Sequence, residues 1–214
     1  ALVRGVRGQS DGVGVHARLG AAPGLARHIG LGTGVVSHED GHELRFAVNY
    51  LAPFLLTRLL EPLIVRSAPA RIVNVSSAGQ AAIDFDDVML EQAYSGIQAY
   101  RQSKLGQIMF TFDLAGELLK AGVTVNALHP ATFMPTKMVL EGGARPMSSI
   151  EEGADATLRL VADTDLDGVT GRYFDGQREA GAHAQAYDLD ARRRLRELSA
   201  ELVGLPAAAA QEPT

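Results

Sequence analysis

The sequence contains no cysteine and only three lysines, Lys104, Lys120 and Lys137. Without cysteine the chain can form no disulfide framework, cysteine nucleophile or thiolate metal site, and no bound metal is expected. No apolar run approaches the roughly 18 residues that a membrane-spanning helix needs. Residues 1–15 carry charges and glycines where a signal peptide has its apolar segment. We therefore expect a cytoplasmic protein with no membrane partner.

An excess of positive charge is also lacking. Lysine and arginine together number 20, against 25 aspartate and glutamate residues, which gives a formal net charge of −5. A nucleic-acid-binding domain presents a basic surface instead, so no nucleic-acid partner is expected. At 214 residues the chain is long enough for one domain of ordinary size.

Residues 1–34 lack aromatic side chains and have Asp11 as their one acidic residue, but they hold nine glycines. So many glycines do not favour a regular core element. We expect residues 1–28 to be an atypical Gly/Ala/Arg-rich segment and residues 29–204 to form the domain. Residues 205–214 should be a flexible tail.

From residue 37 onward, helical and strand patterns alternate. Apolar residues at helical spacing begin at Leu44, although Pro53 is expected to interrupt or kink this helix. Apolar strands alternating with helices predict an α/β fold, a Rossmann-like doubly wound parallel sheet in three layers. Its ligand crevice should lie at the carboxyl ends of the strands. Strands are predicted over 71–77, 123–130 and 168–176, and further helices over 99–122, 148–163 and 188–204.

The stretch "AYRQSK", residues 99–104, places Tyr100 four residues before Lys104, so the two side chains share a helix face. A phenol is a poor acid or base at neutral pH, but a cation held beside it favours the phenolate. Such a pair suits proton transfer to or from a substrate oxygen. The spacing alone is also compatible with a tyrosine that packs on the sheet beside a solvated lysine.

Two hydroxyls and an amide are expected near this pair. Ser76 and Ser77 end the strand that precedes the helix, at the same sheet edge as Tyr100. A serine hydroxyl there can hydrogen-bond a substrate carbonyl as charge develops on its oxygen, or the serines merely end the strand. Asn49 lies among apolar residues and needs hydrogen-bond partners, either at the break near Pro53 or at the site.

Together, "NVSS" (74–77), "YRQSK" (100–104) and "VNALHPAT" (125–132) resemble the short-chain dehydrogenase/reductase family. The first helix and the long gap between Ser77 and Tyr100 are most similar to its retinol-dehydrogenase-type members. The resemblance covers about residues 29–190. It implies an oxidoreductase that uses NAD or NADP to interconvert a small-molecule carbonyl and an alcohol by hydride transfer.

The resemblance also implies a role for each matching residue. Tyr100 would be the general acid/base, and Ser77 would orient the carbonyl or hydroxyl. Lys104 would favour the phenolate and hold the nicotinamide ribose, and Asn49 would complete a proton relay through a water. Ala131 stands where the family usually has glycine. The implied cofactor-binding residues are Tyr100, Lys104, Pro130, Ala131 and Thr132.

One part of the family pattern is missing. Members begin with a strand, a Thr-Gly-x-x-x-Gly-x-Gly turn that binds pyrophosphate, and a helix, and later carry Asn-Asn-Ala-Gly. Gly8, Gly12 and Gly14 match only the glycines of that turn, and Asn-Asn-Ala-Gly does not occur. We therefore expect residues 1–28 not to be native family sequence. The sheet should be incomplete at its N-terminal side, with the strand of residues 71–77 at an exposed edge.

Other interpretations remain open. The alternative function is a catalytically inactive fragment or interaction protein without cofactor binding. An acyl hydrolase using Ser77 is disfavoured because the chain lacks a Gly-x-Ser-x-Gly turn. Family members commonly pair through the helices that match residues 41–64 and 99–121, which allows a homo-oligomer. Residues 175–188 are expected to be a substrate lid or an exposed loop.

Overall fold

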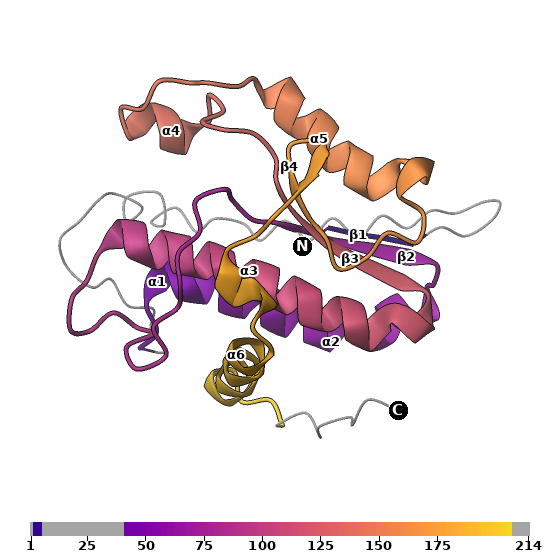
Figure 1. Ribbon diagram of the computed structural model, residues 1–214, viewed down its shortest axis with the longest axis horizontal. Helices are drawn as coiled ribbons and strands as arrows, with labels where there is room; N and C mark the ends of the chain where they lie inside the picture. The colour runs from indigo at the N-terminus through magenta and orange to yellow at the C-terminus, as the bar shows by residue number, and fades with distance from the viewer. Residues whose placement is uncertain (1, 6–40, 207–214) are drawn as a thin grey trace.

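The computed structural model describes residues 2–5 and 41–206. Within these ranges a five-stranded sheet is flanked by helices on both faces (Figure 1). Its strands are β1 (Leu2–Gly5), β2 (Ala70–Val75), β3 (Val123–His129), β4 (Tyr173–Asp175) and β5 (Arg178–Ala180). The helices are α1 (Leu44–Phe46), a π-helical turn (Ala47–Leu51), α2 (Ala52–Arg66), α3 (Gly96–Leu118), α4 (Lys137–Glu141), α5 (Ile150–Ala162) and α6 (Leu189–Leu202). Short 3₁₀ turns span Leu119–Ala121, Thr164–Leu166 and Ala184–Tyr187.

The strands lie in the order β1-β2-β3-β4-β5. β2, β3 and β4 are parallel, whereas β1 and β5 pair antiparallel with β2 and β4 at the two edges. Parallel strands need crossover connections. Here α3 joins β2 to β3 along one face, and α5 joins β3 to β4 along the other (Figure 1). The predicted α/β, Rossmann-like doubly wound fold is confirmed, with the correction that the sheet is mixed rather than purely parallel.

The edge of β2 that was expected to be exposed is covered by β1. Residues 2–5 pair with residues 70–73 in antiparallel register. The glycine content of residues 1–34 did not favour a regular core element, and the strand found at residues 2–5 is an edge strand. An edge strand needs a single backbone partner, so a glycine-containing segment with no clear apolar alternation can still form one. The Gly-x-x-x-Gly-x-Gly match at residues 8–14 and the domain boundary at residue 28 lie outside the described residues.

α1, the π-helical turn and α2 form one continuous rod that passes through Pro53 without a break. In the turn the Ala52 N–H bonds to the carbonyl of Ala47, five residues earlier. Pro53 has no N–H to give to the carbonyl of Asn49, four residues before it. The wider π turn lets the helix continue past this missing bond. The predicted interruption is therefore a local change of helical geometry.

The same rod, Leu44–Arg66, is long and apolar enough to cross a membrane by length and composition. The prediction rested on uninterrupted apolar runs, and Arg58 and Glu61 interrupt this one. The expectation that no segment is long and apolar enough to cross a membrane is therefore wrong. The rod also serves as a core helix, since Tyr50 and Phe54 are almost fully buried. The Phe54 ring meets a phenylalanine ring of α3 at a centroid distance of 5.0 Å.

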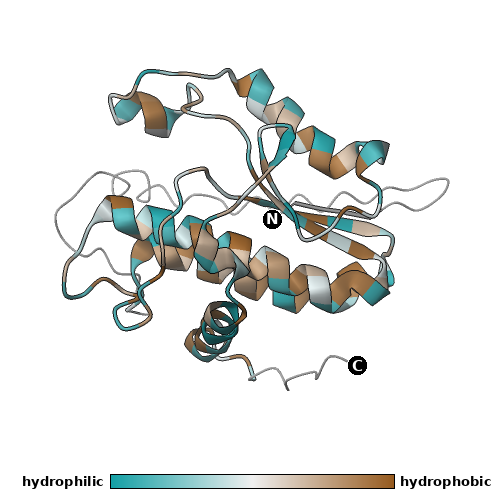
Figure 2. Cartoon of the chain, viewed as in Figure 1, coloured by the Kyte–Doolittle hydropathy of each residue, from teal (hydrophilic) through white to brown (hydrophobic). Residues whose placement is uncertain are grey.

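α3 is the central helix of the domain. Ser95 caps its N-terminus by accepting a hydrogen bond from the Gln98 N–H. The helix therefore begins at Gly96, earlier than the predicted residue 99. Gly122, the last residue of the predicted helix, closes the following 3₁₀ turn in the left-handed conformation. Apolar residues are frequent along α2 and α3, whereas α6 is mainly hydrophilic (Figure 2).

The C-terminal part completes the sheet. α5 begins with a capping box between Ser149 and Glu152, close to the predicted start at residue 148. β4 is shorter than the predicted strand over 168–176, because Gly168 and Gly171 have φ angles of 77° and 68° in the turns before it. The expected lid or loop instead contains the β4–β5 hairpin and a 3₁₀ turn.

α6 is fixed to the domain by inward-facing polar groups. Asp113 of α3 pairs with Arg192 and Arg196 of α6, each at 3.1 Å. The hydroxyls of Tyr50, on the rod, and Ser199, on α6, lie 2.8 Å apart. Two arginines of the last helix therefore pair with a carboxylate that burial has largely removed from solvent.

Gly106 allows α3 to approach the rod closely. A Cβ atom at this position would lie 3.0 Å from the ring of Tyr50. Replacing Gly106 with valine should therefore destabilise the protein by about 1–3 kcal/mol through overpacking. Gly116→Val on the same helix is the matched control, because nothing lies within 4 Å of the corresponding point. Urea denaturation measures both variants, and equal free energies of unfolding would contradict this account.

Candidate active site

The predicted catalytic residues come from three elements that meet at the carboxyl end of β2. Ser76 and Ser77 follow β2 directly. Tyr100 and Lys104 lie in the first half of α3, and Asn49 lies in the π-helical turn of the rod. The carboxyl end of a parallel strand is where an open α/β sheet binds its ligand.

Ser76 has a structural role at this point. Its N–H donates to the carbonyl of Leu128 in β3 at 2.7 Å. Its Oγ donates to the carbonyl of Lys104 at 2.7 Å. Ser76 therefore joins β2 to both β3 and α3, and its hydroxyl is already used within the fold.

Ser77 and Tyr100 both lie close to one glycine, Gly79. The Ser77 Oγ accepts a hydrogen bond from the Gly79 N–H at 3.1 Å. A Cβ atom on Gly79 would stand 3.5 Å from that Oγ and 3.8 Å from Cε1 of Tyr100. Because glycine has no side chain, there is room beside both the serine hydroxyl and the phenol ring. The two predicted residues are thus brought together.

Lys104 lies one helical turn beyond Tyr100, with its Nζ 5.8 Å from the centroid of the Tyr100 ring. The ammonium donates to the carbonyl of Val75 and to Oε1 of Gln107, both at 3.1 Å. Burial lowers the pKa of Lys104 from 10.5 to about 8. An ammonium has three N–H groups, and these two contacts use two of them.

Asn49 contacts α3 beside the peptide of Tyr100. Its Nδ2 donates to the Ser103 Oγ at 3.1 Å, and that hydroxyl donates to the carbonyl of Tyr100 at 2.7 Å. Sequence reasoning left open whether Asn49 serves the break near Pro53 or the site. The Asn49 amide contacts α3, where Ser103 links it to the peptide of Tyr100. A π-helical turn at such a position is a frequent feature of functional sites.

The segment after β3 flanks this group from the neighbouring strand. His129 Nε2 and Thr132 Oγ1 lie 3.0 Å apart, so the histidine is hydrogen-bonded within the fold. Burial lowers the pKa of His129, with the charge of Asp175 acting in the opposite direction. Ala131 packs toward α5, where its Cβ would be 3.7 Å from a side chain on Gly153. Pro130, between them, is partly buried.

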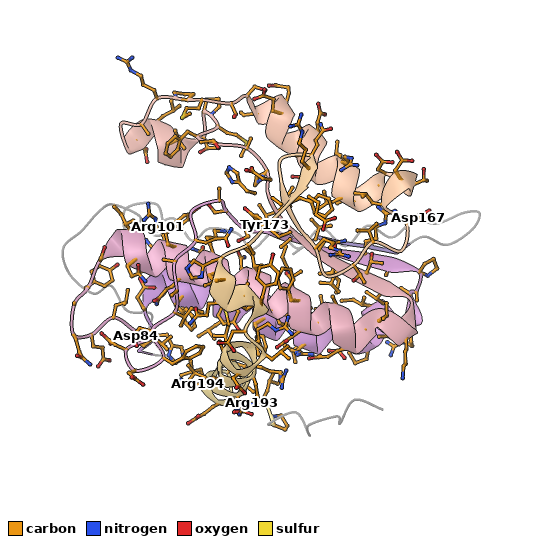
Figure 3. The ribbon with its side chains drawn as sticks, in the orientation of Figure 1. Asp84, Arg101, Asp167, Tyr173, Arg193 and Arg194 are labelled. Atoms are coloured by element: carbon orange, nitrogen blue, oxygen red, sulfur yellow. The ribbon has the colours of Figure 1, made fainter. Side chains whose placement is uncertain are left out.

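Two residues near Ser77 were missed by sequence reasoning. Tyr173 of β4 and Gln80 both donate hydrogen bonds to the Ser77 carbonyl, at 3.1 Å and 3.2 Å. Figure 3 labels Tyr173 near the middle of the molecule, where the chain from β4 passes α3. Burial raises the pKa of Tyr173 to about 12. The sequence feature that could have pointed to Tyr173 is its predicted strand, because a strand parallel to β3 ends at the same edge of the sheet.

A groove of about 620 Å³ lies elsewhere, between α6 and the loop that carries Phe85. None of the predicted site residues lines it. In the described ranges, no group of three or more histidine, aspartate or glutamate side chains is arranged to hold a metal ion. The groove is lined by Phe85, Arg194, Glu197, Leu198, Glu201 and Leu205.

Comparison with solved structures supports the fold. A crystal structure of an uncharacterised protein from Mycobacterium paratuberculosis superposes with a TM-score of 0.60. The match covers 82% of this chain and 64% of that one, at 24% identity. A short-chain dehydrogenase/reductase from Burkholderia xenovorans gives a TM-score of 0.50 over 68% of this chain and 57% of its own, at 22% identity. At these identities the likeness concerns the fold alone.

Sequence comparison gives closer relatives. Retinol dehydrogenase 13 of Mus musculus is 40% identical over 185 residues, which are 78% of this chain and 55% of that protein. Retinol dehydrogenase 14 of Mus musculus is 39% identical over 181 residues, with 78% and 54% covered. The chain thus spans about half the length of these curated relatives. The family model described as short chain dehydrogenase matches residues 30–145, a range that includes every predicted site residue. The chain therefore belongs to the short-chain dehydrogenase family.

Proposed function

We propose that the chain is an NAD(P)-dependent oxidoreductase that interconverts a carbonyl compound and its alcohol. The observation that carries the proposal is the grouping of the Ser77 hydroxyl, the Tyr100 ring and the Lys104 ammonium at the end of β2. Membership of the dehydrogenase family supports it. Relatives named retinol dehydrogenases support a small, largely apolar alcohol or aldehyde as substrate.

In this proposal Tyr100 moves the proton of the reacting oxygen. It donates the proton to the carbonyl oxygen during reduction and removes it from the hydroxyl during oxidation. The Ser77 hydroxyl donates a hydrogen bond to the same oxygen and stabilises the charge that develops on it. The positions of both groups around Gly79 support their acting on one atom.

Lys104 and Asn49 support the tyrosine. The ammonium of Lys104 favours the phenolate because an opposite charge lies beside it. Its remaining N–H is suited to a sugar hydroxyl of a bound cofactor. Asn49, which is joined through Ser103 to the peptide of Tyr100, would continue the path of the proton through a water.

The described residues fit the nicotinamide end of such a cofactor. Their donor set consists of an ammonium with a spare N–H, and a serine hydroxyl and a tyrosine ring beside a glycine, with residues 130–132 at the neighbouring strand end. When bound, the cofactor supplies or accepts the hydride. We propose Tyr100, Lys104, Pro130, Ala131 and Thr132 as the residues that hold it, with no preference between NAD and NADP.

The second candidate is a catalytically inactive chain that binds no cofactor. The pairing of β1 favours it, because β1 is antiparallel to β2 at the edge where a doubly wound sheet continues with parallel strands. Dinucleotides bind across the point where the strand order reverses, so both sides of that point are needed. A chain with only one side complete would keep the catalytic residues without binding the cofactor.

A fluorescence titration of the purified chain with NADH and NADPH separates the two candidates. We expect saturable binding that Lys104→Ala weakens roughly tenfold, since the variant loses a hydrogen bond from a charged donor. Lys120→Ala is the control, because Lys120 is an exposed lysine near the far end of the same helical segment. A folded chain that shows no saturable binding of either nucleotide would refute the first candidate and support the second.

We also propose a homo-oligomer through the helices near residues 41–64 and 99–121, and the cytoplasm as the compartment. Leu59 and Leu63 of α2 support the oligomer, because they are 63% and 46% exposed. Apolar side chains of this size on one helix face are common at contacts between subunits. Sedimentation velocity of a detergent-free preparation measures the state, and a monomer at tens of micromolar would contradict the proposal.

A further inference from the structure

Ser77 lies beyond the end of β2, where the sheet no longer holds the backbone. β2 ends at Val75, and the N–H of Ser76 makes the last hydrogen bond to β3 at this end. The carbonyl of Ser77 accepts two side-chain hydrogen bonds instead, from Oη of Tyr173 at 3.1 Å and from Nε2 of Gln80 at 3.2 Å. A carbonyl oxygen has two lone pairs, so its accepting capacity is filled.

Both donors are themselves held in place. Tyr173 is 3% exposed and extends from β4, which is in register with β3. The Oε1 of Gln80 accepts a hydrogen bond from the N–H of His183 at 2.8 Å. Gln185 then pairs with both the N–H and the carbonyl of Ile83, at 2.7 Å and 3.0 Å. The loop after β2 is thus fixed by the chain between β5 and α6.

Tyr173 can act only as the donor in this contact. The carbonyl of Ser77 has no hydrogen to give, so the phenol must keep its proton. Burial, followed by the charge of Asp175, raises the pKa of Tyr173 to about 12, and the group therefore stays protonated at neutral pH. With 3% exposure the phenol is also closed off from a substrate. The phenol therefore serves as a hydrogen-bond donor to the Ser77 carbonyl.

We propose that Tyr173 and Gln80 are positioning residues that fix the Ser77 peptide and so aim the Ser77 Oγ at the space beside Tyr100. The value of this for catalysis rests on the proposed function. A hydroxyl that must meet a developing oxyanion has to be held within a few tenths of an ångström, and a shift of about 1 Å removes most of its effect. Within a sheet, backbone hydrogen bonds to the neighbouring strand fix each peptide. At Ser77 two side chains take over this role.

The test begins with a measurement that needs neither substrate nor cofactor. Ser-Ala dipeptides occur at 67–68, 77–78 and 199–200. With ¹³C-carbonyl serine and ¹⁵N-alanine, a two-dimensional NMR spectrum of the full chain therefore contains three signals, and the Ala78→Gly variant assigns the one from Ser77. The ¹³C frequency of a carbonyl falls when it loses a hydrogen bond, so this signal reports the proposed contact directly.

Tyr173→Phe removes one donor and keeps the buried ring. We expect the Ser77 signal to move to lower ¹³C frequency while the Ser67 signal stays in place. Tyr50→Phe is the matched control, because it removes an equally buried hydroxyl whose partner is Ser199. It should change only the Ser199 signal. An unmoved Ser77 signal in folded Tyr173→Phe would overturn the proposal.

Gln80→Glu gives a second variant, in case the first does not fold. It keeps an acceptor for the His183 N–H and removes the donor to Ser77, so the same displacement is expected. With retinal and NADPH as probes, kcat should fall roughly tenfold in each variant while the KM for NADPH stays unchanged. A displaced signal with unchanged kcat would overturn the catalytic purpose. A wild type that neither binds NADH or NADPH nor turns over the probe would refute the proposed function alone, and the carbonyl signal would still decide the positioning.

Discussion

Replacing Tyr100 with phenylalanine is expected to lower kcat by about 10²–10⁴-fold, the range that a lost general acid/base typically produces. The ring and its packing on α3 remain, so the free energy of unfolding should change little. Binding of NADH should weaken only severalfold, because the variant loses one contact with the cofactor while Lys104 keeps its position beside Val75 and Gln107. The larger loss would therefore fall on kcat rather than on the dissociation constant of the cofactor.

Tyr187→Phe is the matched control for this experiment. Tyr187 is 55% exposed and its hydroxyl accepts a hydrogen bond from the Ala182 N–H, away from Gly79 and Ser77. Its replacement should leave kcat within about twofold of the wild type, as expected for a surface substitution. Initial rates of NADPH oxidation with retinal measure both variants. Full turnover by Tyr100→Phe would exclude this phenol as the proton donor.

The position of the site was accessible from sequence because topology limits where strand ends can lie. The apolar run before Ser77 and the helix that carries Tyr100 form one βα unit, and such a unit brings the strand end to the start of the helix. The spacing of Tyr100 and Lys104 then places both side chains on one helix face. These arguments use only contacts close in sequence.

Other features depend on long-range pairing and could not be predicted. Tyr173 reaches Ser77 only because β4 pairs with β3 in one particular register. The π-helical turn at Asn49 arises from the balance between Pro53 and the packing of the rod on α3, which a periodicity argument does not contain. β1 was missed because antiparallel edge pairing leaves no alternation in its own four residues. Sequence patterns report a residue's neighbours along the chain, and these features depend on neighbours across the fold.

The choice between the two serines shows the same limit. Both hydroxyls follow the same strand. The sequence pattern did not distinguish them, and only the family resemblance favoured Ser77. In the structure Ser76 Oγ is bound to the carbonyl of Lys104, whereas Ser77 Oγ lies beside Gly79. The two hydroxyls therefore differ in contacts with residues distant in sequence, which a motif does not contain.

The largest effect of pH on stability is expected from Lys104. Burial lowers its pKa in the folded protein to about 8, against 10.5 for the ordinary side chain. Below pH 8 the amine is charged in both states, and the folded state bears the whole cost of burying the charge. Between about pH 8 and 10.5 the unfolded chain binds the proton and the folded chain does not, so stability rises with pH. As the pH falls from about 10.5 to 8, this gain is lost.

The size of the effect follows from the shift. Each pKa unit corresponds to about 1.36 kcal/mol, so the rise across the window is on the order of 3 kcal/mol. Other groups titrate in the same range, among them the tyrosines of the unfolded chain. The informative quantity is therefore the difference between the wild type and Lys104→Met, which removes the charge and keeps most of the side-chain length.

We expect the free energy of unfolding of the wild type, measured by urea denaturation from pH 6.5 to 10, to rise relative to that of Lys104→Met. The variant leaves Val75 and Gln107 without their donor, which lowers its stability by an amount that does not vary with pH. The slope thus isolates the buried charge, whatever the offset. Lys120→Met, at an exposed position, should run parallel to the wild type, and a parallel course for Lys104→Met as well would show that the ammonium is well solvated. Lys104 would then destabilise the fold at neutral pH, and yet it lies beside Tyr100. Functional sites commonly show this trade of stability for reactivity, so the result would support a chemical role for the lysine.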